Sequence, residues 1–175
     1  MGLLARAALA GAAVLAAQAC LAAQATPEYQ VKVVLLDKLT RFVDWPGGGS
    51  PNRAFVLAVL GRTPFGDDLD AYFASHTVKN RPVTIRYLHQ PAEVKDCDLL
   101  FICASEQPRL GAILEPLKGH PVLTVGDSEG FAQAGVMVGM VRAGGKITFE
   151  VNLAPVREAG LRMAPGFLQL VKIVP

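Results

Sequence analysis

Three runs of apolar and β-branched residues stand out along the chain, and each has the length of a β-strand. They are Phe55–Leu60, Leu99–Cys103 and Val122–Val125. Because polar residues do not alternate within them, each run is expected to be buried on both faces, like a central strand of a parallel sheet. The pattern therefore predicts a sheet with at least three central strands.

A different pattern follows in residues 136–152. The run Val136–Val141 leads to Gly144-Gly145, and Ile147–Asn152 then alternates apolar and polar residues. Two glycines between strand-like runs favour a tight turn, because both central residues of such a turn need a positive φ. The alternation predicts that the second arm shows one face to solvent. We expect residues 121–152 to form a core strand followed by an antiparallel hairpin.

An amphipathic helix is predicted to begin at Thr26-Pro27-Glu28. These residues suit a helix start because threonine caps, proline fixes φ, and glutamate lies at the positive end of the helix dipole. Apolar residues then recur at helical spacing, which predicts an inward stripe. The stripe consists of Val31, Leu35, Leu39 and Phe42, opposite Lys32, Asp37, Lys38 and Arg41. The helix is expected to stop at Trp45-Pro46, before Gly47-Gly48-Gly49.

The other segments alternate between helix and strand patterns. They predict short helices at 67–74, 106–117 and 152–161, a half-exposed edge strand at 81–88, and a last helix from Pro165 onward. Strands that alternate with helices indicate an α/β domain. We predict one domain over residues 26–175, with a three-layer Rossmann/flavodoxin-like fold. Its mixed sheet is expected to be mostly parallel and to end in a C-terminal antiparallel hairpin.

Residues 1–25 have the layout of a cleaved secretory signal peptide. Arg6 precedes an Ala-rich apolar run, and Ala23-Gln24-Ala25 matches an A-x-A cleavage site. We expect cleavage after Ala25, with Ala23 as the alternative. The apolar run falls short of the roughly 20 residues that a membrane anchor needs. Cys20 raises the alternative of a lipoprotein, but the residues before it make a poor lipidation site. The expected location is therefore the periplasm.

Charge and composition narrow the class of partner. The formal charge of +2 falls to +1 once Arg6, the only charged residue of the leader, is removed. So small a charge argues against a nucleic-acid partner. Charged residues make up 18% of the chain, below the average of about 25%. We expect some of the surplus apolar residues to lie in a subunit or partner interface.

The two cysteines of the mature chain bracket a predicted strand. Cys97 and Cys103 are six residues apart. In an extended strand their Cα atoms would be roughly 20 Å apart, far beyond the reach of a disulfide. We therefore predict two buried free thiols and no disulfide, with a redox pair as the alternative.

Three turns are expected to meet at the carboxyl edge of the sheet, where ligands of open α/β sheets bind. They contain Arg62, Ser105 and Asp127, each of which follows a predicted central strand. One interpretation is a small-ligand pocket, in which Arg62 meets an anion while Ser105 and Asp127 offer polar contacts. The alternative is that the serine and aspartate only cap helices and form turns, which is common at such positions.

Sequence signatures of catalysis and metal binding are missing. The chain has no G-x-S-x-G elbow, no phosphate-binding G-x-x-x-x-G-K-[ST] loop and no G-x-G-x-x-G after a strand. His76, His89 and His120 do not pair with each other or with a cysteine at metal-ligand spacing. We therefore expect a protein that is not an enzyme and that uses neither a metal nor another cofactor.

A set of landmarks across nearly the whole mature chain resembles the YfiR-like family of periplasmic proteins. The landmarks are Tyr29-x-Val31-Lys32, Leu36, Phe42-Val43, Trp45-Pro46, Leu60-Gly61, Pro64-Phe65-Gly66, Arg81-Pro82-Val83, Cys97–Ile102, Pro121–Val125, Asp127, Gly130-Phe131-Ala132 and Phe149–Leu153. The C-terminal part departs from the family pattern, since Ala164-Pro165-Gly166 stands where a serine-containing helix start is expected.

The resemblance implies a non-enzymatic regulator. A member of the family binds the periplasmic sensor domain of an inner-membrane diguanylate cyclase and holds it inactive, which limits cyclic di-GMP. It acts as a homodimer and also contacts an outer-membrane-associated lipoprotein. By analogy, this chain is expected to inhibit an inner-membrane signalling protein. The alternative is a periplasmic small-molecule sensor that uses the crevice at the strand ends.

Two aromatic residues are candidates for the partner contact. Phe42 and Trp45 lie at the end of the first predicted helix, before a Gly-rich loop. A tryptophan in such a place is often partly exposed. The alternative is that Trp45 packs inside and closes the core.

Overall fold

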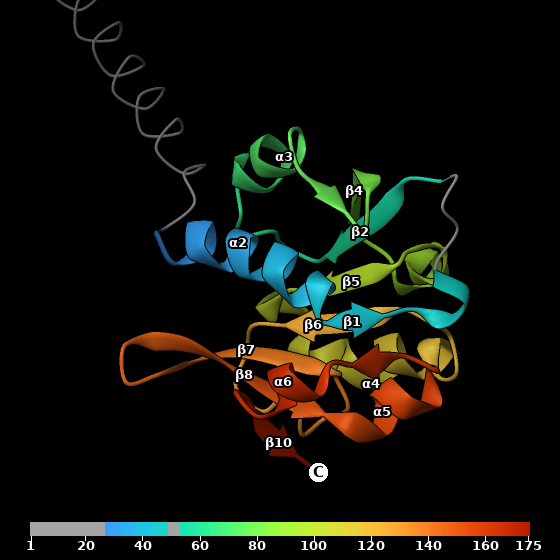
Figure 1. The fold of residues 1–175 in the computed structure, drawn as a ribbon, viewed down its shortest axis with the longest axis vertical. Helices are drawn as coiled ribbons and strands as arrows, with labels where there is room; N and C mark the ends of the chain where they lie inside the picture. The colour runs from blue at the N-terminus through green and yellow to red at the C-terminus, as the bar shows by residue number, and fades with distance from the viewer. Residues whose placement is uncertain (1–26, 49–52) are drawn as a thin grey trace, which may run out of the picture.

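A computed structural model describes residues 27–48 and 53–175 (Figure 1). The signal-peptide prediction, Cys20, Thr26 and Gly49 lie outside these residues. The main sheet has the strand order β10-β8-β7-β6-β5-β2-β4-β3. Its strands are β2 (Phe55–Leu60), β3 (Thr77–Val78), β4 (Arg81–Leu88), β5 (Leu99–Ile102), β6 (Leu123–Gly126), β7 (Val138–Ala143), β8 (Lys146–Asn152) and β10 (Lys172–Val174). A second, two-stranded sheet pairs β1 (Val43–Asp44) with β9 (Arg162–Met163).

The centre of the main sheet is parallel and confirms the predicted fold class. β2 pairs in parallel with both β4 and β5, and β5, β6 and β7 continue in the same direction. The order β4-β2-β5-β6-β7 is the flavodoxin-like 2-1-3-4-5 arrangement, whose topological switch point lies between the first and third strands. Here that point is the boundary between β2 and β5, and the turns after these two strands contain Arg62 and Ser105.

The hairpin is confirmed, but it does not form the edge of the sheet. β7 and β8 are antiparallel and turn through Gly144 and Gly145, which both have positive φ. β10 then adds to β8 in parallel. The helix predicted from Pro165 is α6 (Pro165–Leu168) and ends early, because the chain turns back at 169–171 to pair Lys172–Val174 with β8.

Helical segments cover both faces of the sheet and complete the three layers. One face carries α2 (Pro27–Arg41), α3 (Asp68–Phe73), α5 (Leu153–Glu158) and α6, with η2 (Pro46–Gly48) following α2 and β1. The other carries η3 (Pro91–Asp96), η4 (Ala104–Arg109), α4 (Leu110–Leu114) and η5 (Glu115–Leu117). The helix predicted at 106–117 is broken into these last three pieces, because Pro108 and Pro116 interrupt helical hydrogen bonding. Asn152 caps α5 by accepting a hydrogen bond from Ala154 N–H.

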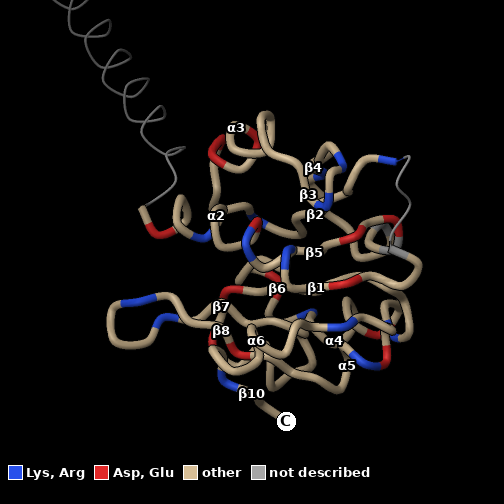
Figure 2. The backbone as a smooth tube through the Cα atoms, in the orientation of Figure 1, with Lys and Arg blue, Asp and Glu red and all other residues tan. Residues whose placement is uncertain are grey.

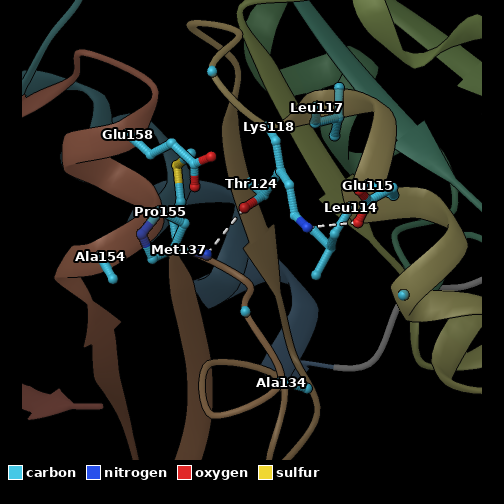
Figure 3. Close-up of a pocket in the computed structure, with 13 residues that line it drawn as sticks. Leu114, Glu115, Leu117, Lys118, Thr124, Ala134, Met137, Ala154, Pro155 and Glu158 are labelled. Carbon is cyan, nitrogen blue, oxygen red and sulfur yellow. Dashed lines mark hydrogen bonds and ion pairs between the residues drawn. The ribbon is translucent and has the colours of Figure 1, made fainter.

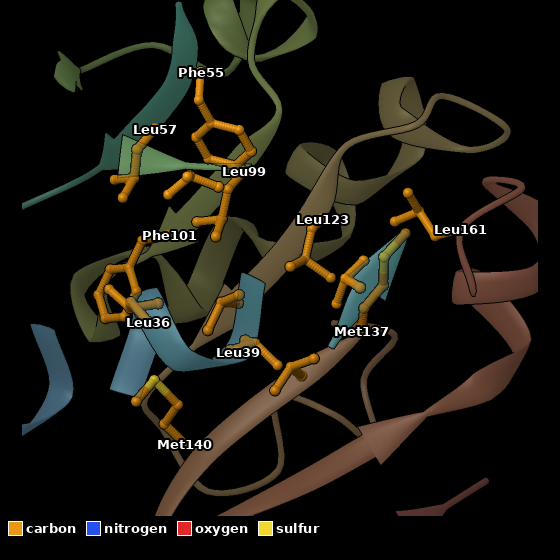
Figure 4. Packing of buried hydrophobic residues seen from close by; sticks show 14 of the residues in the cluster. Leu36, Leu39, Phe55, Leu57, Leu99, Phe101, Leu123, Met137, Met140 and Leu161 are labelled. Carbon is orange, nitrogen blue, oxygen red and sulfur yellow. The ribbon is translucent and has the colours of Figure 1, made fainter. Parts of the chain in front are cut away.

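Alternate residues of the central strands belong to two separate hydrophobic cores, one on each face of the sheet. Phe55, Leu57, Leu99 and Phe101 point toward α2, while Leu100 and other alternating neighbours point toward α4. Figure 4 shows Leu36 and Leu39 of α2 packed among the first group. Burial on both faces is what the unbroken apolar runs predicted.

The buried face of α2 differs from the predicted stripe. Its buried residues are Lys32, Val33, Leu36, Asp37, Leu39 and Thr40. Val31 and Phe42 of the predicted stripe are exposed instead. Both buried charges have partners: Lys32 contacts Asp127, and Asp37 accepts hydrogen bonds from Tyr72 and Arg41. Pairing reduces the cost of burying a charge, so these two polar side chains can take core positions.

Asp98, just before β5, bonds to residues at the amino ends of β2 and β4. Its carboxylate pairs with Arg81 at 3.0 Å and Arg53 at 2.7 Å, and accepts Val56 N–H at 2.8 Å. Its backbone carbonyl accepts a hydrogen bond from the Trp45 indole at 3.1 Å. The segment from Tyr29 in α2 to Trp45 therefore crosses the sheet from Asp127, at the carboxyl end of β6, to Asp98, at the amino end of β5.

Candidate functional site

Asp127 is held beneath the first turns of α2. Its Oδ2 accepts a hydrogen bond from Tyr29 Oη at 2.7 Å and lies 3.4 Å from Lys32 Nζ. The Asp127 side chain is 2% exposed and that of Lys32 is 3% exposed. Oδ1 is buried and has no hydrogen-bond partner among the described residues. Burial, together with the bond to Asp127, raises the pKa of Tyr29 well above its ordinary value, so the phenol stays protonated and can donate this bond.

The same network reaches the hairpin. Lys32 pairs with Glu28 at 2.7 Å, and Glu28 also lies 3.4 Å from Arg142 of β7. The hydrogen bond from Lys32 lowers the pKa of Glu28. Figure 2 shows basic positions on the protruding hairpin formed by β7 and β8. Arg142 and Glu28 thus form a partly exposed ion pair between the hairpin and the start of α2.

Arg62 and Ser105 meet at the topological switch point, as the order of strands requires. Arg62 N–H donates to Ser105 Oγ at 3.0 Å. The two residues line a shallow crevice of about 560 Å³ together with Thr63, His89 and Glu106. Asp127 does not line it. The structure thus brings together two of the three predicted ligand residues and places the third under α2.

Gly61 makes the close approach between these two turns. Its φ is +101°, and a Cβ at this position would lie 2.5 Å from Ser105 Oγ. The Glu106 side chain would be only 2.8 Å away. Glu106, the carboxylate of the crevice, is bonded to Arg109, whose Nε donates to it at 3.0 Å. The Arg62 guanidinium also lines the crevice and pairs with no carboxylate among the described residues.

The two predicted partner residues differ in accessibility. Phe42 is 39% exposed and stacks on Phe167 of α6, with ring centroids 5.1 Å apart. Trp45 is only 9% exposed and packs edge-on against Phe55 at 5.4 Å. The expectation of a partly exposed tryptophan is therefore wrong. The indole bond to Asp98 explains why Trp45 is drawn into the core.

An apolar surface extends from Phe42 along the outer side of α2. Val31 is 51% exposed and Val34 is 38% exposed. At the end of the helix, Phe167 stacks on Phe42 and contacts Phe149 of β8 edge-on at 5.6 Å. We call the exposed residues Val31, Val34 and Phe42 the α2–α6 surface. Phe167 is only 4% exposed and supports Phe42 from beneath. Sequence patterning missed Val34. It also missed the stacking of Phe42 on Phe167, which arises only when α6 folds back toward α2.

Cys97 and Cys103 are both free and buried. Cys97 belongs to the core on the α4 face and Cys103 to the core on the α2 face. Burial raises the pKa of each thiol to about 12. Thiols with so high a pKa are poor nucleophiles at neutral pH.

Within residues 27–48 and 53–175, no group of three or more His, Cys, Asp or Glu side chains is arranged to hold a metal ion. None of the helices in these ranges combines the length and the apolar content needed to cross a bilayer.

Solved structures with similar folds support the architecture. An ABC domain from Streptococcus pneumonia, in complex with L-Trp, superimposes with a TM-score of 0.55 and 10% identity, covering 83% of this chain and 60% of that one. A conserved domain protein from Vibrio cholerae gives a TM-score of 0.55 and 9% identity, covering 87% of this chain and 61% of that one. At such low identities these likenesses concern the fold alone.

Sequence comparison adds one relative and one family. A UDP-N-acetylmuramate–L-alanine ligase from Roseiflexus castenholzii is 32% identical over 125 residues, which cover 70% of this chain and 26% of the ligase. The chain thus spans about a quarter of that enzyme. The model of the YfiR/HmsC-like family matches residues 29–172, from Tyr29 in α2 to Lys172 in β10. The chain therefore belongs to the YfiR/HmsC-like family.

Proposed function

We propose that this protein is a periplasmic regulator that binds the sensor domain of an inner-membrane signalling protein, of the diguanylate cyclase class, and holds it inactive. The observation that carries the proposal is the set of apolar side chains that α2 leaves exposed, while two charged side chains of the same helix are buried. Lys32 and Asp37 are buried, while Val31 and Val34 face solvent. Membership of the YfiR/HmsC-like family supports the regulatory role.

Exposed valines on α2 fit a surface that binds a partner. Exposed apolar side chains gathered on one face often mark a protein interaction site. On α2, Val31 and Val34 lie on the solvent side, and Phe42 continues the surface onto α6. The aromatic stack provides a rigid anchor, and aromatic residues are enriched among the residues that dominate binding energy.

Inhibition requires a preference for one state of the partner. A regulator shifts an equilibrium only by the difference between its affinities for the two states. We infer that the α2–α6 surface fits the inactive form of the sensor domain better than the active form. The proposal includes export by the leader at residues 1–25, action as a homodimer, and contact with an outer-membrane-associated lipoprotein.

The cellular test is deletion of the gene followed by measurement of cyclic di-GMP. The proposal expects the level to rise, and re-expression of the protein to restore it. An unchanged level, with no diguanylate cyclase co-purifying with the protein, contradicts the proposal.

A second candidate function is the sensing of a small molecule at the switch-point crevice. It is favoured by the Arg62 guanidinium beside Ser105, which pairs with no carboxylate among the described residues, and by the similarly folded ABC domain that was solved with L-Trp. A ligand that binds only the folded protein raises its melting temperature. A thermal-shift screen of amino acids, vitamins and nucleotides tests this function, and the absence of any stabilising compound contradicts it.

A further inference from the structure

The main sheet opens between β6 and β7. These strands pair only through Val125–Val138 and Gly126–Gly139. Within the described residues, Thr124, one residue earlier in β6, is not paired with β7. Its hydroxyl instead accepts a hydrogen bond from Met137 N–H at 2.9 Å. A gap therefore lies at the amino end of β6, on the edge of the sheet opposite the switch-point crevice.

A cavity of about 350 Å³ occupies this gap (Figure 3). Its apolar walls come from Leu114 and Leu117 on one side and from Met137 and Pro155 on the other. The volume lies within the range of small-molecule sites, which are typically apolar and contain a few placed polar groups. The cavity has the size and the lining of a ligand site.

One polar group lies deep in the cavity. Thr124 is 1% exposed and lines the wall. A hydroxyl has one donor and two acceptor positions, and the bond from Met137 N–H uses only one acceptor. Its O–H donates no hydrogen bond to any other described residue. The inner end of the cavity therefore carries a single hydroxyl, bonded to Met137 N–H, in an otherwise apolar space.

The mouth of the cavity carries an excess of negative charge. Lys118 pairs with Glu115 at 2.6 Å, and both side chains are exposed. Glu158 faces this pair from α5 on the other side of the opening and makes no salt bridge with a described residue (Figure 3). Both glutamates raise the pKa of Lys118, the bonded Glu115 more strongly. One carboxylate remains uncompensated at the mouth.

We propose that this cavity binds a small organic cation with an apolar body, such as a primary amine. The apolar part lies between Leu114, Leu117 and Met137, and the ammonium group pairs with Glu158. An anion meets the uncompensated carboxylate and is disfavoured, whereas a neutral molecule of the same shape lacks the ion pair. The inference is independent of the regulatory function proposed above.

An occupant of the cavity would join elements from opposite faces of the sheet. Leu117 of η5 packs in the core on the α4 face, whereas Val156 of α5 packs in the core on the α2 face. α5 immediately follows β8, the second strand of the hairpin. Binding here is therefore expected to stabilise α5 against the sheet.

The test compares three probes of equal length by isothermal titration calorimetry on the folded, leaderless protein: hexylammonium, 1-hexanol and hexanoate. Hexylammonium is expected to bind about 2- to 5-fold more tightly than 1-hexanol, because a partly exposed ion pair adds that much affinity. Hexanoate is expected to bind most weakly. The absence of binding by any probe, or equal or tighter binding of hexanoate, overturns the proposal.

Three variants locate the site. Glu158→Gln is expected to remove the preference for the amine, while Glu129→Gln, an exposed carboxylate that does not line the cavity, leaves it unchanged. Gly111→Leu fills the cavity, since a Cβ there meets no atom within 4 Å, and it is expected to abolish binding. Ala154→Leu fills it from α5 if the first filling variant does not fold. Binding that survives filling, or a preference that survives Glu158→Gln, contradicts the proposal.

Discussion

Lys32 and Asp127, 95 residues apart, form an ion pair of 3.4 Å in which both side chains are almost completely buried. Each charge has a further contact: Glu28 lies 2.7 Å from the ammonium, and Tyr29 Oη donates to the carboxylate. The pair attaches the start of α2 to the carboxyl end of β6. It therefore determines which face of the helix is left outside.

Loss of the lysine should be costly, because it leaves the Asp127 carboxylate buried with only the tyrosine bond. We expect Lys32→Met to destabilise the protein by about 3 kcal/mol, as measured when one partner of a buried pair is removed. Urea unfolding followed by circular dichroism measures the change. Lys38→Met, at an exposed position of the same helix, is the control and should stay within about 0.5 kcal/mol. Equal stability of the two variants would show that the buried pair has no energetic role.

The free energy of unfolding should fall at acidic pH as Glu28 and Glu150 become protonated. Lys32 lowers the pKa of Glu28, and Lys172, 2.7 Å away, lowers that of Glu150. Both carboxyl groups therefore ionise more readily in the folded protein than in the unfolded chain. Their contribution to the free energy of unfolding is fully present above the ordinary pKa of 4.5, and it is lost as the pH falls through the lowered pKa. Urea midpoints measured from neutral to acidic pH check this. Glu150→Gln should flatten the acid limb, and an unchanged slope would contradict the assignment.

Gly61 should not tolerate a side chain. Its φ of +101° is unfavourable for other residues, and a Cβ would lie 2.5 Å from Ser105 Oγ. We expect Gly61→Ala to cost about 2 kcal/mol or more in the free energy of unfolding. Gly144→Ala is the matched control, since that glycine also has a positive φ but a Cβ there meets nothing within 4 Å. A similar loss in both variants would mean that backbone strain, and not the contact with Ser105, determines the cost.

Neither Cys97 nor Cys103 should react with iodoacetamide in the folded protein. Both are buried, and burial raises each pKa to about 12, so the reactive thiolate is scarce at neutral pH. Peptide mass spectrometry after alkylation, with and without urea, measures the modification of each residue. A disulfide between them, or rapid alkylation without urea, would contradict this prediction.

Much of the fold could be predicted from local pattern. The runs containing Phe55 and Leu99 could be predicted as central strands, because strands buried on both faces lack polar alternation. Both runs are buried strands in the structure. The glycines of the hairpin identified its turn correctly. β10 could not be predicted in this way, because Lys172–Val174 becomes a strand only by pairing with β8.

The candidate site was less predictable, because it depends on contacts between distant residues. Arg62 and Ser105 could be placed together from the strand order. Asp127 could not be assigned to α2, since its partners lie 98 and 95 residues earlier. Hydrophobic periodicity also failed on α2, because it treats Lys32 and Asp37 as solvent-facing although ion pairs and hydrogen bonds allow their burial.

The most direct test of the regulatory account measures binding of the purified protein to the periplasmic domains of the membrane-bound diguanylate cyclases of the same organism. The native protein should bind, and Val31→Glu should weaken binding about tenfold or more, because it places a charge in an apolar contact. Ala112→Glu, an exposed helix position on the opposite face of the sheet, should bind like the native protein. Equal affinities for the native protein and Val31→Glu, or no binding by the native protein, would contradict the central claim.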